Sequence, residues 1–414
     1  MTVKQQAKSA KQVAKQLALA STGVKNEALL AIAEALTKHT EEILTANQKD
    51  VAAAKESGMS KAMLDRLTLT EERIVAMVTG VREVMALEDP VGEFLSMQSR
   101  PNGLKIGKKR VPLGVCAIIY EARPNVTVDA AVLCLKAGNA VVLRGGKEAI
   151  CTNTALMNTM RRALGETELS PDVMHLVADT SRESATELMT LTGLIDVLIP
   201  RGGAGLIRTV VEHAKVPVIE TGVGVCHIFA DQTADLEMAV NIIENAKCTR
   251  PSVCNAAETL LVHETIAQSL LPLVHLRLQA HNVEIRGDEK TCEILGEGIT
   301  KAKEDDFGVE FLDYILAVKV VKDIEEALAH IETHGSGHSE CIVTESYQNS
   351  QQFLDTVDAA AVYVNASTRF TDGGMFGLGA EIGISTQKMH ARGPMGIKEL
   401  TCTKFVVYGS GQIR

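Results

Sequence analysis

The sequence contains no tryptophan and only 3% aromatic residues, so the core of the folded chain is expected to be aliphatic. Apolar residues make up 46% and charged residues 23% of the chain, which is ordinary for a soluble globular protein. A length of 414 residues exceeds one small domain, and at roughly 100–200 residues per domain it predicts two or three of them.

Long apolar runs are also missing. No run reaches the ~18 residues that a membrane-spanning helix needs, and the lysine-containing first helix, through about Leu19, lacks the apolar centre of a signal peptide. A formal net charge of −10 argues against general affinity for nucleic acid or anionic membranes. These absences predict a cytoplasmic protein that binds neither, although a locally positive pocket can still hold a small anion.

The nine cysteines are dispersed, without a CxxC pair or a Cys/His cluster of zinc spacing. Such a set is typical of free thiols in a reducing cytosol, and no metal site is expected. The chain also lacks GxGxxG and GxxxxGK[ST]. Neither the usual dinucleotide fingerprint nor a Walker A loop therefore applies.

Residues 1–90 have helical periodicity and are expected to cover a sheet. Residues 94–112 then predict a hairpin with its turn at residues 101–103, and residues 401–407 alternate as a strand. The basic residues of the second hairpin strand indicate an arm for pairing subunits. A plain surface hairpin explains them almost as well.

Residues 115–219 alternate between short apolar runs and helical runs, which is typical of βαβ units with a parallel sheet covered on both faces. The strands expected here are residues 115–120, 140–143, 173–177, 195–199 and 216–219. The helices expected between them are residues 126–136, 150–164, 183–191 and 206–213. Ligands of such sheets bind at the carboxyl ends of the strands.

A second α/β region follows on a smaller scale. The strands expected in it are residues 257–262, 316–321, 341–344 and 361–364. The helices expected in it are residues 236–246, 266–280, 324–333 and 348–357. From residue 360 onward the chain becomes rich in glycine and in charged residues, which is typical of a long active-site loop.

The loops after four strands of the first region are residues 121–127, 144–149, 200–205 and 220–224, and three of them are glycine-rich. Glycine lets a backbone approach a phosphate closely, and the helix that follows favours an anion. Arg144, Lys147 and Arg201 add positive charge. Three such loops at one edge of a sheet predict a phosphate-bearing cofactor.

The segment NAKCTRPSVCN, residues 245–255, places Cys254 on an irregular loop between a helix and a strand. A thiol held in this way can be exposed and still fixed, as a covalent nucleophile requires. Backbone amides around it could donate to an oxyanion. The competing interpretation is a small buried hydrophobe, as most free cysteines are.

Several motifs together resemble the aldehyde dehydrogenase superfamily, and within it the branch that reduces γ-glutamyl phosphate. They are YEARPNVT, LRGGKE, IPRGGAGL, RPSVCN, YVNASTRFTDGG and ISTQKMHARGPMG. The resemblance runs from about Leu64 to the C-terminus. It implies an α/β fold with two doubly wound parallel-sheet domains and a small β oligomerisation arm. It also implies NADPH-dependent reduction of γ-glutamyl phosphate to glutamate 5-semialdehyde and phosphate, in proline biosynthesis.

The resemblance assigns ranges and partners as well. It implies a cofactor-binding domain in residues 1–92 and 113–240 and a catalytic domain in residues 241–402. The oligomerisation arm is expected in residues 93–112 and 403–414. The partners expected are a small-molecule substrate, further copies of the chain in a homo-oligomer, and the glutamate kinase that supplies the acyl phosphate.

Carried over by position, Cys254 resembles the thiol that becomes a thioester, and Asn125 resembles the side-chain donor to its oxyanion. Lys147 is similar to the lysine at the adenosine ribose, and Glu310 is similar to the acid at the nicotinamide ribose. The residues that match the loop under the pyrophosphate are Gly202, Gly203 and Gly205. With Arg144 and Lys147, these residues form the expected NADP(H) site.

Two positions bear on the reaction and the cofactor. Glu220 aligns with the base that activates water in hydrolytic relatives, a step that a reductase of an acyl phosphate does not need. Ile150 stands three residues after the ribose lysine, where many NAD-dependent relatives carry a glutamate. The missing carboxylate is consistent with a 2′-phosphate and hence with NADP(H).

In the implied chemistry the Cys254 thiolate attacks the acyl phosphate, phosphate leaves, and a hydride reduces the thioester. Three arginines are candidates for binding the phosphate or the substrate carboxylate, with structural salt bridges as the alternative at each: Arg123, Arg250 and Arg369. Lys247 and Arg250 are near Cys254 in sequence, but the sequence does not show which group lowers the pKa of the Cys254 thiol.

Other classes compete with this interpretation. A hydrolytic aldehyde dehydrogenase for another small aldehyde would use Glu220. A thiol acyltransferase or amidase without nicotinamide, or a catalytically silent oligomeric scaffold, would not need the three glycine-rich loops.

Overall fold

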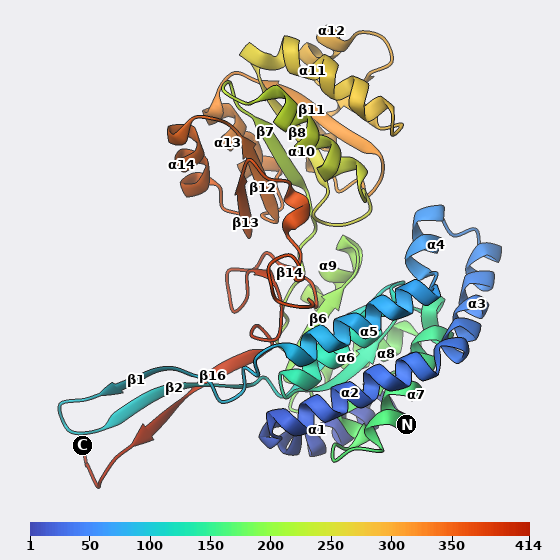
Figure 1. The fold of residues 1–414 in the computed structure, drawn as a ribbon, viewed down its shortest axis with the longest axis vertical. Coiled ribbons are helices and arrows are strands. Elements are labelled where there is room, and N and C mark those ends of the chain that lie inside the picture. Colours follow the sequence, from blue (N-terminus) through green and yellow to red (C-terminus); the bar gives the residue numbers. More distant parts are fainter. The chain divides into compact units, whose positions relative to one another are not determined.

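In the computed structural model, which describes residues 1–414 apart from the side chain of Ala62, five helices open the chain (Figure 1). They are α1 (Val3–Leu19), α2 (Thr22–Lys38), α3 (Thr40–Glu56), α4 (Lys61–Leu67) and α5 (Glu71–Ala86). Four of them begin after a Ser or Thr whose hydroxyl accepts a backbone N–H of the first turn: Thr2, Ser21, Ser60 and Thr70. The helical prediction for residues 1–90 is confirmed.

A four-stranded parallel sheet follows, with the strand order β5-β4-β3-β6. Its strands are β3 (Val115–Tyr120), β4 (Ala140–Arg144), β5 (Met174–Leu176) and β6 (Val197–Arg201). Its helices are α6 (Pro124–Lys136), α7 (Ile150–Leu164), α8 (Arg182–Thr190) and α9 (Ala204–His213). The predicted alternation of strands and helices is confirmed, and β3 is buried along its whole length.

The strand predicted at residues 216–219 is wrong. This segment makes only an isolated parallel bridge between Leu198 and Val218. Leu198 donates to the carbonyl of Pro217, and Ile219 donates back to Leu198. Because Pro217 has no N–H, it cannot extend the ladder.

A seven-stranded parallel sheet forms in the second half, in the order β10-β9-β11-β8-β7-β12-β13. Its strands are β7 (Cys226–Ala230), β8 (Ala257–His263), β9 (Glu284–Gly287), β10 (Thr300–Lys301), β11 (Ile315–Val321), β12 (Ser339–Val343) and β13 (Ala361–Val364). Its helices are α10 (Leu236–Cys248), α11 (Glu264–Gln279), α12 (Glu289–Leu295), α13 (Ile324–His334) and α14 (Tyr347–Thr356). One apolar cluster packs α10 and α11 on the sheet, and another packs α13 and α14, so the sheet is doubly wound.

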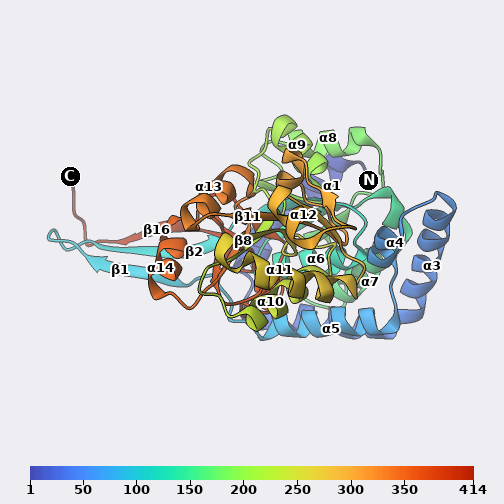
Figure 2. The same cartoon turned by 90° about the horizontal axis from the view of Figure 1, so that it is seen from above.

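Three antiparallel strands form a separate small sheet, in the order β1-β2-β16. They are β1 (Phe94–Ser99), β2 (Lys105–Pro112) and β16 (Thr401–Tyr408). Figures 1 and 2 both show these strands side by side, extending beyond the helices of the same unit. The predicted hairpin and terminal strand are confirmed, and β16 begins two residues before the predicted arm range.

The chain divides into two units that exchange segments. The first contains residues 1–221, 377–383 and 395–414, and the second contains residues 222–376 and 384–394. The predicted boundary between residues 240 and 241 falls inside α10, so these units differ from the predicted ranges. The reason is β7, a buried strand missing from the sequence analysis, which pairs with β8 and β12. The roles assigned to the ranges remain predictions.

The late glycine-rich segment is mostly irregular. It contains the short pair β14 (Ile384–Ser385) and β15 (Gly393–Pro394) and contributes to both units. Among the helices that the structure describes, none is long and apolar enough to cross a membrane.

Candidate active site

The loop that carries Cys254 joins α10 to β8 in the second unit. Cys254 is half-buried, and its carbonyl accepts a hydrogen bond from the Cys226 thiol with an S···O distance of 3.2 Å. A Cβ atom on Gly224 would lie 1.6 Å from the same carbonyl oxygen. Glycine at position 224 is therefore required for the close approach that holds this loop.

Cys254 differs in its surroundings from most of the other thiols. Five of the nine free cysteines are buried: Cys116, Cys134, Cys226, Cys248 and Cys341. Burial raises the pKa of Cys248 to about 11 and that of Cys341 to about 12. Both remain protonated at neutral pH and are poor nucleophiles. A half-buried thiol on a fixed loop suits covalent chemistry better.

Asn255 follows the thiol and fastens its loop to the late glycine-rich segment. Its side-chain nitrogen donates to the carbonyl of Thr371 at 2.9 Å and to that of Arg369 at 3.3 Å. The Arg369 guanidinium donates to the Asn255 side-chain oxygen, and the Thr368 hydroxyl donates to the Asn255 carbonyl at 2.7 Å. Residues 368–371 thus lie directly against the Cys254 loop.

Two of the predicted arginines, Arg250 and Arg369, lie within electrostatic range of each other, and Arg369 also lies within range of this thiol. Burial lowers the pKa of Arg369, the nearby charge of Arg250 lowers it further, and Cys254 acts in the opposite direction. Two guanidinium groups within each other's field repel, so an anion between them would be favoured. The arrangement can hold a phosphate or a carboxylate close to Cys254.

Lys247 and Glu258 form a buried ion pair at the two ends of this loop. The distance from the lysine nitrogen to the carboxylate oxygen is 2.6 Å, and both side chains are inaccessible to solvent. Burial lowers the pKa of Lys247 and raises that of Glu258 to about 7, although each partner opposes the shift of the other. Lys247 is therefore engaged in joining α10 to β8.

Glu310 also supports the loop. Its carboxylate accepts the Gly224 amide at 3.0 Å, and Gly224 is the residue that touches the Cys254 carbonyl. Arg123, a candidate ligand for the substrate anion, and Glu220, which aligns with the base of hydrolytic relatives, belong to the first unit. The predicted site residues are therefore divided between the two units.

In the first unit, Arg144 is the last residue of β4, and its side chain is hydrogen-bonded to the loop before α8. Its guanidinium donates to the carbonyls of Thr180 at 2.6 Å and Ser181 at 3.0 Å, and burial lowers its pKa. Lys147 begins a 3₁₀ turn (Lys147–Ala149) and is exposed. Of these two predicted cations, Lys147 is the one open to a ligand.

The glycine-rich loop after β6 leads into α9, whose first amides have no side-chain cap. Gly203 instead donates its amide to the Glu121 carboxylate at 2.9 Å, and a Cβ atom on Gly202 would lie 2.6 Å from the same carboxylate. Gly205 faces open space. A helix N-terminus favours an anion, and here the Glu121 carboxylate takes that place, so a pyrophosphate at the start of α9 requires Glu121 to move away.

Asn125 lies in the first turn of α6, is exposed, and donates its side-chain amide to Asp129 at 2.9 Å. Burial raises the pKa of Asp129 to about 6, while this hydrogen bond and the charge of Arg201 oppose the rise. Arg201 ends β6, and its guanidinium lies 4.0 Å from the Glu381 carboxylate. These four side chains belong to the first unit.

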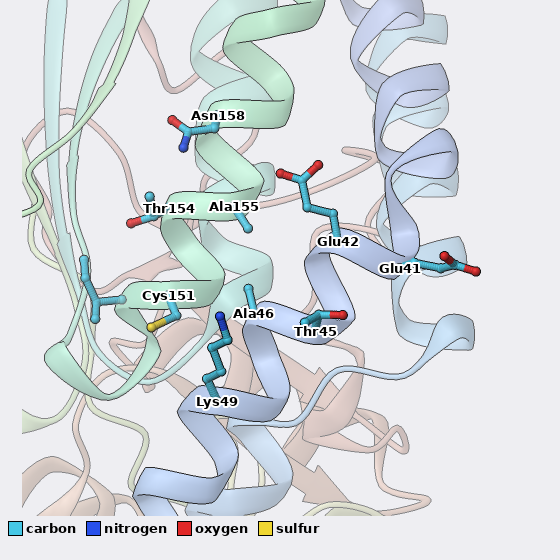
Figure 3. A pocket seen from close by; sticks show the side chains of 10 residues that line it. Glu41, Glu42, Thr45, Ala46, Lys49, Cys151, Thr154, Ala155 and Asn158 are labelled. Atoms are coloured by element: carbon cyan, nitrogen blue, oxygen red, sulfur yellow. The ribbon is translucent and has the colours of Figure 1, made fainter.

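Ile150 lines a groove of about 680 Å³ between α3 and α7. Figure 3 shows Lys49 and Cys151 near each other in this groove, with Glu41 and Glu42 on the α3 side. Position 150 is therefore open to a larger side chain. Whether it bears on cofactor choice stays a prediction.

Three residues that contact the predicted site residues were not predicted from the sequence: Glu121, Asp129 and Asn255. The sequence did contain a signal for Asp129, because the observed helix begins two residues before the predicted one and includes both Asn125 and Asp129, whose side chains meet at a spacing of four. Asn255 and Glu121 had none, because their partners lie far along the chain. The described His, Cys, Asp and Glu side chains form no group of three that could hold a metal ion.

The chain belongs to the aldehyde dehydrogenase family, whose sequence profile matches residues 1–306. It is similar to gamma-glutamyl phosphate reductase of Carboxydothermus hydrogenoformans, with 62% identity over 99% of this chain and 98% of the relative. The crystal structure of gamma-glutamyl phosphate reductase from Thermotoga maritima superposes with a TM-score of 0.96, at 50% identity and full coverage of both chains. An acetylating aldehyde dehydrogenase from Geobacillus thermoglucosidasius shares the fold, with a TM-score of 0.74 and 18% identity over 100% of this chain and 97% of the other.

This membership makes the chain an oxidoreductase with a nicotinamide cofactor. The predicted fold class is confirmed, with two parallel-sheet units of the aldehyde dehydrogenase type.

Proposed function

We propose that this protein reduces γ-glutamyl phosphate to glutamate 5-semialdehyde and phosphate with NADPH, as a step of proline biosynthesis. Relatives that carry the name gamma-glutamyl phosphate reductase match nearly the whole chain at 62% and 59% identity. The structural observation that carries the proposal is Arg369, which is hydrogen-bonded to Asn255 next to Cys254 and lies in the field of Arg250, because an acyl phosphate substrate brings a dianionic leaving group to the thiol.

Covalent attack comes first in the proposed reaction. The Cys254 thiolate adds to the acyl carbonyl, and the carbon–oxygen bond to phosphate then breaks with its electron pair leaving on phosphate. Arg250 and Arg369 bind the departing anion, and Asn255 holds Arg369 in place. The product of this half-reaction is a thioester on Cys254.

Stabilisation of the oxyanion is assigned to the Asn125 side-chain amide and the Cys254 backbone amide, since fixed donors at a developing charge lower the barrier. The cofactor, when bound, supplies the hydride that reduces the thioester. The chain's own part is to orient it. Gly202, Gly203 and Gly205 would receive the pyrophosphate at the start of α9, while Lys147 and Glu310 would hold the two riboses.

NADPH is proposed over NADH because the loop after β4 presents the exposed Lys147 and no carboxylate at Ile150. A 2′-phosphate beside a lysine is attracted, whereas beside a glutamate it would be repelled.

The exposed apolar side chains of the arm support assembly with further copies of the chain. Phe405 is 72% exposed, Val407 54% and Tyr408 54%. Such a patch on a strand with an unpaired edge is typical of an interface. We infer a homo-oligomer formed through this arm.

The test is the phosphate dependence of the reverse reaction. Glutamate 5-semialdehyde and NADP⁺ should give NADPH, followed at 340 nm, only when phosphate or arsenate is present, because the acyl group needs that acceptor. Glu220→Gln should then change the rate little. Sustained oxidation without phosphate, lost in Glu220→Gln, would instead assign the protein to the hydrolytic class.

A further inference from the structure

The Asn125 side chain is held by one described contact. It lies exposed on the first turn of α6, and its nitrogen donates to the Asp129 carboxylate at 2.9 Å. An amide has a donor end and an acceptor end of nearly the same shape, so an unrestrained asparagine can present either. Only the nitrogen end can stabilise an oxyanion.

An ionised carboxylate removes this ambiguity, because it accepts hydrogen bonds and donates none. It binds one N–H of Asn125 and leaves the second N–H of the same nitrogen free to donate. A protonated carboxyl, in contrast, can donate to the amide oxygen and so tolerates the reversed orientation.

We propose that Asp129 is a positioning residue, whose ionised carboxylate fixes the Asn125 amide so that its nitrogen end, and not its oxygen end, is available as the oxyanion donor. This inference rests on the proposed function, in which Asn125 is the oxyanion donor. Asp129 acts through Asn125 and is not itself assigned a contact with substrate.

Burial of Asp129, opposed by its hydrogen bond to Asn125 and by one nearby charge, sets the pH at which the carboxylate can orient Asn125. Among the described residues, Arg201 of β6 is the charged group whose field acts on Asp129, and Arg201 in turn faces Glu381 at 4.0 Å. Burial raises the pKa of Asp129 from 3.8 to about 6. A raised pKa means that the carboxyl is ionised above about pH 6 and takes up a proton below it. The ionised Asp129 carboxylate therefore fixes the orientation of the Asn125 amide at pH 7–8, and this restraint is lost near pH 5, where the carboxyl is protonated.

The first test is Asp129→Asn, which keeps the shape but can both donate and accept. We expect kcat for acyl phosphate reduction to fall roughly tenfold, part of the 10²–10³-fold loss typical when an oxyanion donor is removed. KM should stay within about twofold. The decline of wild-type kcat below pH 6 should flatten in this variant, and Asp129→Glu should restore an inflection. Asp355→Asn, an exposed change on α14, should match the wild type.

A double-mutant cycle with Asn125→Ala separates positioning from a structural role. In the Asn125→Ala background, Asp129→Asn should have no further effect on kcat. An equal loss in both backgrounds, or an unchanged pH profile in Asp129→Asn, would overturn the inference. A wild-type enzyme without phosphate-dependent NADPH formation would overturn the proposed function instead. Thermal unfolding of Asp129→Asn should show an unchanged or higher midpoint, since a partly buried charge is removed.

Discussion

Arg369 donates from its guanidinium to the side-chain oxygen of Asn255, the residue that follows Cys254. The Asn255 nitrogen donates back to the Arg369 and Thr371 carbonyls. The cation proposed to bind the leaving phosphate is thus fastened to the same loop as the proposed nucleophile. If Arg369 binds phosphate as proposed, phosphate binding and the position of the thiol are coupled through Asn255.

Replacing Cys254 by serine should abolish turnover, because a hydroxyl at neutral pH is a far weaker nucleophile than a thiolate. NADPH affinity, measured by fluorescence titration, should remain within about twofold. Iodoacetamide should inactivate the wild type with the label on Cys254, and substrate should protect it. Cys402→Ser, at an exposed thiol of the arm, serves as the control and should retain activity. Full activity in Cys254→Ser would refute the covalent route.

Arg369→Lys keeps the charge but removes the planar fork that contacts Asn255 and is proposed to bind the phosphate. We expect KM for the acyl phosphate to rise about tenfold or more, since charge-assisted bidentate bonds are among the strong ones. The rate of Cys254 alkylation should change little. Arg277→Lys on α11, an exposed arginine paired with Glu244, is the matched control. An unchanged KM would remove Arg369 from the anion site.

Ile150→Glu should shift cofactor preference from NADPH toward NADH. Like charges a few ångströms apart near a surface repel by several kcal/mol, which predicts a change of about tenfold or more in the ratio of kcat/KM values. Thr154→Glu places the same carboxylate further along the same groove and should shift the ratio less. A wild-type preference for NADH, or equal shifts in both variants, would contradict the proposed role of position 150.

Lys247→Met should destabilise the fold by about 3–5 kcal/mol, because it leaves the Glu258 carboxylate buried without its partner. The double variant Lys247→Met, Glu258→Leu should recover most of this loss, since neither buried charge remains. Urea unfolding followed by circular dichroism gives the comparison. Lys290→Met breaks the exposed pair with Glu264 and should cost at most about 1 kcal/mol. A single variant as stable as the wild type would show that the pair is dispensable.

Local patterns in the sequence predicted much of the fold. Helical periodicity predicted that residues 1–90 are helical, and alternation of apolar runs with helices located β3 through α9. These signals are short-range, because each depends on neighbours within a few residues. β7 was missed, since the run Cys226–Ala230 directly follows a glycine-rich stretch interpreted as a loop. Its identity as a strand comes from β8 and β12, which pair with it from far along the chain.

The sequence by itself determined the composition of the candidate site: a thiol in RPSVCN, glycine-rich turns before helices, and arginines in the late segment. Only the tertiary structure decided which of these residues meet. It brought Arg369 to Asn255 across 114 positions and engaged Lys247 with Glu258. It also placed residues 377–383 in the first unit, where Glu381 faces Arg201. The physical reason is that such contacts depend on burial and on sheet register, which are set by the whole packed chain rather than by any local pattern.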